Sequence, residues 1–246
     1  MANVAEGEHT VVHRSVHSGT YKRAFHLPLL VSSFLILASG FCAAATTVDL
    51  YREAVPSVAT LLVSKADGSQ ALASAFLSLK DGVAITAWHA VKDARRVVAR
   101  FPSGEEFEVS GLIDKDEKRD VAAIRVKVFG RPLLKLSEDA PPVGMDAFVI
   151  GAPKGLEFSV SDGVVSQVHV AEGVKLYQFT CPASPGNSGG PLIGSDGAVY
   201  GVVSFQFREG QNLNFAVPST YVLGLDISLP TTPWGSSALN RQAPDA

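Results

Sequence analysis

The chain has 246 residues, of which 46% are hydrophobic and 18% are charged, and its formal net charge at pH 7 is −3. This length and composition suit one globular unit or two small ones. The small negative charge, with no block of lysine and arginine, argues against a nucleic-acid-binding protein.

Residues 1–45 have the organisation of a secretory signal. Lys22 and Arg23 precede an apolar run over residues 27–41, and the small residues Ala43-Ala44-Ala45 follow it. The run is shorter than the roughly 20 apolar residues that a membrane-spanning helix needs. We therefore expect a signal peptide over residues 1–45 and an exported protein, periplasmic or extracellular. An uncleaved N-terminal anchor is the alternative, and would be the only membrane contact.

The expected mature chain has few residues suited to disulfides or metals. Cys181 is its one cysteine, so no internal disulfide can form, and we expect this thiol to behave as a small buried hydrophobic residue. Its two histidines, His89 and His169, lie far from Cys181 and from each other in the sequence. We therefore expect no metal and no other cofactor.

Short segments rich in Val, Ile, Leu and Phe, separated by Gly, Pro, Asp and Ser, predict two sets of about six strands each. The first set is Val58–Ser64, Ala71–Leu79, Val83–Ala87, Arg96–Phe101, Glu106–Ile113 and Val121–Val126. The second set is Ala147–Gly151, Phe158–Val168, Lys175–Thr180, Gly189–Gly194, Val199–Phe207 and Asn214–Pro218. Short helical pieces are expected after His89 and near Ser219–Leu225.

This spacing predicts an all-β protein of two six-stranded antiparallel barrels. A break at Ala140-Pro141-Pro142-Val143-Gly144 separates the two sets of strands. We place the barrels at residues 46–140 and 141–226. A flexible tail, polar and rich in proline, is expected over residues 227–246.

The segment Gly186-Asn187-Ser188-Gly189-Gly190-Pro191-Leu192 predicts a nucleophilic serine. Glycines on both sides allow a tight turn that presents the Ser188 hydroxyl to a carbonyl carbon. The backbone of Gly186, Asn187 and Ser188 would form an oxyanion hole, with the amides of Gly186 and Ser188 pointing at the developing charge.

A serine nucleophile needs a base and a group that orients the base. His89 follows the apolar strand Ile85-Thr86-Ala87 and is the predicted base. Asp120 directly precedes the apolar strand Val121–Val126 and is the predicted orienting carboxylate, whereas the charged turn over residues 114–119 should be solvated. An α/β-hydrolase would place its histidine after the serine, and none follows Ser188.

These residues resemble the chymotrypsin-fold serine proteases of the high-temperature-requirement, or Deg-like, type. The matching blocks are Ser74-Ala75-Phe76, Asp81–Val91 with its Thr86-Ala87-Trp88-His89-Ala90, Asp120–Ile124, Pro185–Leu192 and Asn214–Ser219. The resemblance implies two barrels with the active site between them, endopeptidase activity on polypeptides, and a bacterial envelope or secreted location. Many members carry a PDZ domain after the protease, and we expect none here.

By its place in that fold, the first specificity pocket is expected at Pro182, Val203, Ser204 and Phe205. No acidic residue lies there, which disfavours cleavage after Arg or Lys and favours cleavage after apolar residues. His169 in the pocket, with a preference for acidic side chains, is an alternative. Two other hypotheses stay open: a catalytically silent barrel pair that binds unfolded or partner polypeptides, and an active site that orders only on binding a peptide.

Overall fold

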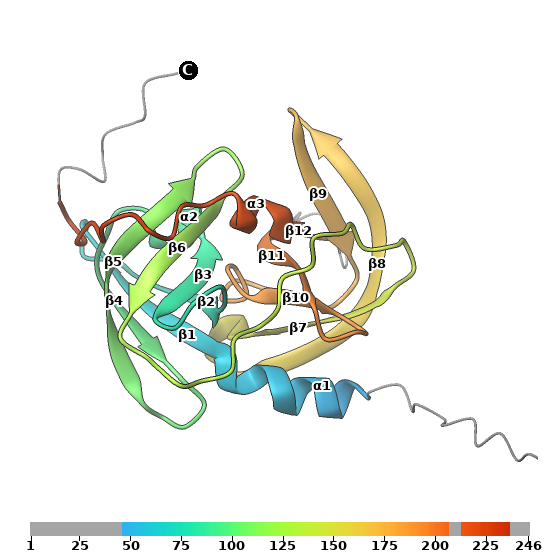
Figure 1. The fold of residues 1–246 in the computed structure, drawn as a ribbon, viewed down its shortest axis with the longest axis horizontal. Helices are drawn as coiled ribbons and strands as arrows, with labels where there is room; N and C mark the ends of the chain where they lie inside the picture. The colour runs from blue at the N-terminus through green and yellow to red at the C-terminus, as the bar shows by residue number, and fades with distance from the viewer. Residues whose placement is uncertain (1–45, 207–212, 237–246) are drawn as a thin grey trace, which may run out of the picture. The chain divides into compact units, whose positions relative to one another are not determined.

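Two closed antiparallel barrels make up the described part of the chain (Figure 1). The computed structural model describes residues 46–206 and 213–236, which belong to one compact unit, Ala43–Ala246. The predicted signal segment, residues 1–45, lies outside the described residues. The predicted all-β class and the pair of six-stranded barrels are confirmed.

The first barrel closes in the order β1-β2-β3-β6-β5-β4, and the second in the order β10-β11-β12-β9-β8-β7. The strands of the first are β1 Val58–Lys65, β2 Gln70–Leu77, β3 Val83–Ala87, β4 Ala94–Arg100, β5 Glu106–Asp116 and β6 Val121–Val126. Those of the second are β7 Asp146–Gly151, β8 Ser159–Ala171, β9 Val174–Phe179, β10 Pro191–Gly194, β11 Val199–Gln206 and β12 Asn214–Pro218. The proposed boundary at residues 140 and 141 falls in the segment that connects the barrels.

Strand β3 shows how the two barrels pack together. All five of its residues are buried, although a barrel strand normally has one solvated face. Ala84 and Ala87 lie in the core of the first barrel. Val83 and Ile85 lie instead in a cluster that also contains Phe148 of β7. The outer face of β3 is therefore covered by the second barrel, and His89 lies two residues after the end of this strand.

In the described part of the chain, three α-helices accompany the barrels: α1 Thr47–Ala54, α2 Trp88–Val91 and α3 Ser219–Leu223. Two 3₁₀ turns, η1 Val55–Ser57 and η2 Pro153–Gly155, are also present. The sequence predicted α2 and α3 but not α1. A capping box of Thr46 and Asp49 starts α1, a local signal that was present in the sequence.

Residues 227–236 differ from the flexible tail predicted over 227–246. They run along β5 of the first barrel, where Thr232 exchanges two backbone hydrogen bonds with Leu112, of 2.9 and 2.7 Å. The indole N–H of Trp234 donates to the Val109 carbonyl at 2.8 Å. Backbone pairing outweighs the polar composition of this segment, which we call the strap. Residues 237–246 lie outside the described residues.

Over residues 46–206 and 213–236, no helix is both long and apolar enough to cross a membrane.

Candidate active site

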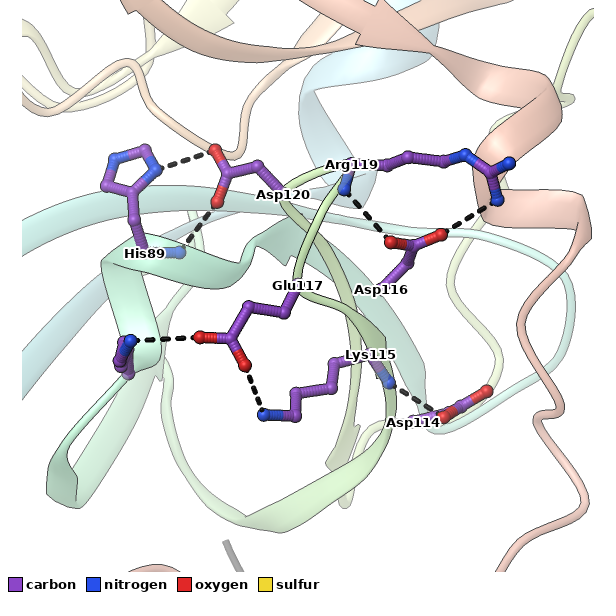
Figure 2. A network of polar contacts seen from close by, with 8 residues as sticks. His89, Asp114, Lys115, Asp116, Glu117, Arg119 and Asp120 are labelled. Atoms are coloured by element: carbon purple, nitrogen blue, oxygen red, sulfur yellow. Dashed lines mark hydrogen bonds and ion pairs between the residues drawn. The ribbon is translucent and has the colours of Figure 1, made fainter. Parts of the chain in front are cut away.

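His89 and Asp120 form a two-point contact (Figure 2). The His89 ring nitrogen Nδ1 lies 2.7 Å from Asp120 Oδ2, and the His89 backbone N–H donates to Oδ1 at 2.8 Å. A carboxylate at Nδ1 selects the tautomer that carries its proton there and leaves Nε2 as a free base. The His89 side chain is 50% exposed, so a substrate can reach it.

Local backbone geometry places Asp120 against the helix that carries His89. Asp120 has a φ of 56°, in the left-handed region that aspartate tolerates better than most residues. Its own carbonyl accepts the Trp88 N–H at 3.2 Å. The carboxylate and the main chain of Asp120 are thus both tied to the first turn of α2.

The charged segment before Asp120, predicted as a solvated turn over residues 114–119, is exposed only at residues 117–119, because residues 114–116 end β5 and are half-buried. Ion pairs order this segment. Glu117 Oε1 accepts from Lys92 Nζ at 2.9 Å and Oε2 accepts from Lys115 Nζ at 3.0 Å (Figure 2). Hydrogen bonds from these two lysines, first Lys92 and then Lys115, lower the pKa of Glu117 to about 2. The turn that carries Asp120 is therefore linked to Lys92, which directly follows α2.

Ser204 connects the two barrels at this point. From β11 of the second barrel its hydroxyl donates to Asp120 Oδ2 at 2.5 Å. Its backbone carbonyl accepts the Ser188 hydroxyl at 3.1 Å. The sequence assigned Ser204 to a specificity pocket, and its contact with Asp120 was not foreseen.

Ser188 lies in this cluster but is not hydrogen-bonded to His89, because its hydroxyl donates to Ser204. The next residue, Gly189, is packed so closely that a Cβ there would lie 2.9 Å from the Ala87 nitrogen, two residues before His89. Hydrogen bonds between a nucleophile and its base are often absent without substrate. All three predicted residues are thus brought to one place, with the serine turned aside.

The nucleophile loop leaves two amides free. The carbonyl of Pro185 accepts from the Lys154 N–H at 2.9 Å, and the carbonyl of Asn187 accepts from Gly190 at 2.9 Å. In a trans peptide the N–H points opposite to the carbonyl, so Gly186 N–H and Ser188 N–H face away from these contacts. Within the described part of the chain neither of these two amides has an acceptor.

Asn187 supplies no third donor. Its N–H already donates to the Ser184 carbonyl at 3.0 Å, and its side chain is 2% exposed. The other backbone groups named in this loop are hydrogen-bonded, and the N–H groups of Gly186 and Ser188 are left without an acceptor. An oxyanion hole requires two such N–H groups beside the nucleophile.

The residues predicted to form the specificity pocket do not line one common pocket in the described part of the chain. Val203 is 3% exposed and belongs to the core of the second barrel, so it lines no pocket. Pro182 is exposed, and its carbonyl accepts the Ser161 hydroxyl at 2.7 Å. The side chain of Phe205 lies outside the description.

An open cleft of about 420 Å³ lies beside the histidine instead. It is lined by His89, Asp120 and Ser204, by apolar residues that we call the apolar wall, and by charged residues. The apolar wall consists of Ala171, Val174, Leu176 and Val217, and the charged residues are Lys118, Arg119 and Glu172. The β8–β9 hairpin supplies most of the wall, and no short sequence signal marked it.

His169 and Cys181 lie outside this cleft. His169 is exposed on β8, where its Nε2 pairs with Gln178 Oε1 at 2.8 Å and its ring packs edge-on against Phe215. Cys181 is fully buried as predicted, and burial raises the pKa of its thiol to about 12.

A family model described as "Trypsin-like peptidase domain" matches residues 73–202, which include His89, Asp120 and Ser188. The chain belongs to this family. The resemblance noted from the sequence motifs is thereby confirmed.

Named relatives extend the match. A protein of Pseudomonas fulva (strain 12-X) named "Probable periplasmic serine endoprotease DegP-like" is 36% identical over 167 residues, which is 63% of this chain and 34% of the relative. A protein of the same name from Ectopseudomonas mendocina (strain ymp) is 33% identical over 187 residues, or 71% of this chain and 38% of the relative. The chain spans about a third of the length of these trypsin-like peptidase relatives.

Solved structures agree on the fold of the trypsin-like peptidase domain. The structure titled "HtrA-type protease AlgW with tripeptide" matches with a TM-score of 0.68 and 24% identity, covering 73% of this chain and 62% of that one. A serine endoprotease from Yersinia pestis matches with a TM-score of 0.65 and 22% identity, over 73% of this chain and 65% of that one. At this identity the likeness supports the double barrel alone.

Proposed function

We propose that the chain is a serine endopeptidase in which Ser188 is the nucleophile, His89 the general base and Asp120 the orienting carboxylate. The observation that carries the proposal is the pair of free N–H groups, those of Gly186 and Ser188, at the predicted nucleophile. Ser204 links this nucleophile, Ser188, to the Asp120–His89 pair through two hydrogen bonds. The family match and the endoprotease names of the relatives support it.

The reaction begins when Ser188 turns its hydroxyl from the Ser204 carbonyl toward His89 Nε2. The oxygen attacks the substrate carbonyl carbon while Nε2 takes the proton, and the Gly186 and Ser188 amides bind the oxyanion. His89 then returns the proton to the leaving amine, which leaves an acyl group on Ser188. Water, activated by the same histidine, hydrolyses this ester. Asp120 fixes the orientation of the ring and stabilises the imidazolium.

An apolar substrate side chain fits the cleft beside His89. The wall formed by Val174, Leu176 and Val217 favours such a side chain by burying it from water. This wall supports the apolar preference better than the residues first assigned to the specificity pocket.

Export to the periplasm belongs to the same proposal. The signal-like segment over residues 1–45 and the periplasmic names of the relatives support it. We further propose that residues 46–140 and 141–226 form the two barrel domains. Fusion of residues 1–60 to a reporter that is active only after export tests the location, and substitution of Leu29 and Leu30 by arginine should abolish the signal.

Labelling by a fluorophosphonate probe tests the chemistry directly. The wild-type protein should be labelled at Ser188 and should cleave a casein substrate, and Ser188→Ala should abolish both. Ser103→Ala, a change in an exposed turn, is the matched control and should behave as wild type.

The second candidate function is a silent barrel pair that binds polypeptide. The hydrogen bond from Ser188 to Ser204, in place of one to His89, is the observation that favours it. Binding of unfolded casein without labelling or cleavage by the folded protein would establish this candidate and overturn the peptidase.

A further inference from the structure

Ser74, on β2 of the first barrel, makes a buried contact with the nucleophile loop of the second barrel. The residue is fully buried. Its hydroxyl donates to the Gly186 carbonyl at 2.7 Å and accepts from the Ala152 N–H at 3.2 Å. Both hydrogen bonds join the first barrel to the second, so these groups meet only when the two barrels pack against each other.

The backbone of Ser74 reinforces this contact. Its N–H donates to the Ser188 carbonyl at 2.8 Å, and its carbonyl accepts the Thr86 hydroxyl at 2.8 Å. Ser74 therefore holds the carbonyls of both Gly186 and Ser188, the two residues whose amides are free.

The backbone packs closely around Ser74 at Gly151 and Gly189, where a side chain would not fit. A Cβ on Gly151 would lie 2.9 Å from the Ser74 hydroxyl, and one on Gly189 would lie 2.2 Å from its carbonyl. Ser74 thus lies against glycine backbone in a closely packed region. If its hydroxyl were removed, a water molecule could take its place as donor to Gly186 only if the loop moved.

Gly186 needs such an anchor. Its φ of 108° is open to glycine and rare for other residues, so few steric barriers hold its two peptide planes. Lys154 holds the plane before Gly186, through the Pro185 carbonyl, and Ser74 holds the plane after it. The Gly186 N–H lies in the first of these planes, and the second carries the Asn187 N–H. The next plane carries the Ser188 N–H and lies between the two peptides whose carbonyls Ser74 holds. If the second plane rotates, the adjoining Ser188 N–H no longer points where the oxyanion forms.

We propose that Ser74 is a positioning residue for the oxyanion hole: its hydroxyl holds the Gly186 carbonyl and its N–H holds the Ser188 carbonyl, and so the peptide between them keeps the Ser188 amide aimed at the reacting carbonyl oxygen. The proposal rests on the proposed peptidase function. It makes the oxyanion hole of the second barrel depend on a contact with the first.

Ser74→Ala tests this inference on the whole chain. Loss of one oxyanion donor typically lowers turnover by about 10²–10³, and misdirection of a donor should cost about 10–100-fold. We expect kcat for peptide cleavage to fall by about that factor, KM to stay within about twofold, and fluorophosphonate labelling to slow in parallel. The NMR chemical shifts of the His89 imidazole should not move, because no described hydrogen bond joins Ser74 to this ring.

Ser78→Ala is the matched control. Ser78 is also buried in the first barrel, and its hydroxyl donates to the Leu134 carbonyl at the same 2.7 Å, away from the nucleophile loop. Both variants should lose similar thermal stability, and only Ser74→Ala should lose kcat. Ser74→Cys retains a weaker donor and should fall between wild type and Ser74→Ala, which also covers the case in which the alanine variant does not fold.

Two results overturn the inference while the wild type remains active: Ser74→Ala with wild-type kcat, or equal losses of kcat in Ser74→Ala and Ser78→Ala. A wild-type protein that is neither labelled nor active overturns the peptidase itself, and the role of Ser74 with it.

Discussion

The Ser204 hydroxyl and the Asp120 carboxylate meet across the two barrels at 2.5 Å. Asp120 Oδ2 also faces His89 Nδ1, so one oxygen serves two partners from different barrels. Since the Ser204 carbonyl accepts from Ser188, the same residue touches both ends of the proposed catalytic chain.

Ser204→Ala should lower kcat/KM by about tenfold. A hydrogen bond to a charged group contributes about 1.5–3 kcal/mol, and water entering the partly open site offsets part of the loss. Steady-state kinetics over pH 5–9 measures the effect. Ser204→Thr keeps the hydroxyl and should retain most activity, and an alanine variant as active as wild type would contradict this role.

Asp120→Asn should lower kcat by about 10³–10⁴, because an amide can stabilise the wrong tautomer of His89 and cannot stabilise the imidazolium. Binding of a peptide product should change little. The measurement is single-turnover acylation with an ester substrate, with Asp116→Asn as the control from the same turn. Equal rates in the two variants would argue against Asp120 as the orienting carboxylate.

Glu117 should make folding stability sensitive to acid. Its pKa of about 2 in the folded protein lies below the ordinary value of 4.5. The ionised form therefore stabilises the fold above pH 4.5, and this contribution disappears as the pH falls from 4.5 toward 2. Its side chain is 42% exposed, so solvent screening limits the gain to about 1 kcal/mol.

Glu117→Gln should thus cost about 1 kcal/mol at pH 7 and nothing at pH 2. Urea denaturation across this range checks the effect, and 1 M NaCl should shrink the difference at pH 7. A penalty that does not change with pH would show that packing, not charge, is responsible.

Gly189→Ala should abolish labelling and destabilise the fold strongly. The added Cβ would lie 2.2 Å from the Ser74 carbonyl at a φ of 85°, so the nucleophile loop must move. Gly104→Ala is the control, since Gly104 has a φ of 83° and no neighbour within 4 Å. The control should lose only about 1 kcal/mol in thermal unfolding, with full labelling. Similar losses in both variants would assign the effect to backbone conformation alone.

Removal of the strap should lower stability without removing the chemistry. Ending the chain after Pro230 deletes the Thr232–Leu112 pairing and the Trp234–Val109 hydrogen bond. Loss of the half-buried indole should cost about 1–3 kcal/mol. Ending the chain after Ser236 keeps these contacts and is the control. Equal melting temperatures for the two truncations would contradict a structural role for the strap.

Local patterns predicted much of the barrel. The bounds of β3, β6 and β12 match the prediction, because alternating or continuous apolar runs ended at clear turn residues. Strand β10 starts at Pro191 and not at Gly189, because Gly189 and Gly190 are used to turn the nucleophile loop. Residue chemistry likewise singles out His89, Asp120 and Ser188 from the sequence alone.

The amino-acid sequence by itself determined the strand pattern, the double barrel and the three residue types of the proposed chemistry, because propensity and side-chain reactivity are local properties. Only the tertiary structure decided which other residues hydrogen-bond to the predicted catalytic residues and to the loop that carries the nucleophile. Ser74 reaches Gly186 across 112 residues of chain, and Ser204 reaches Asp120 across 84. Such partners are chosen when the barrels close on one another, since a buried hydroxyl must then find an acceptor, and no short stretch of sequence records which one it finds.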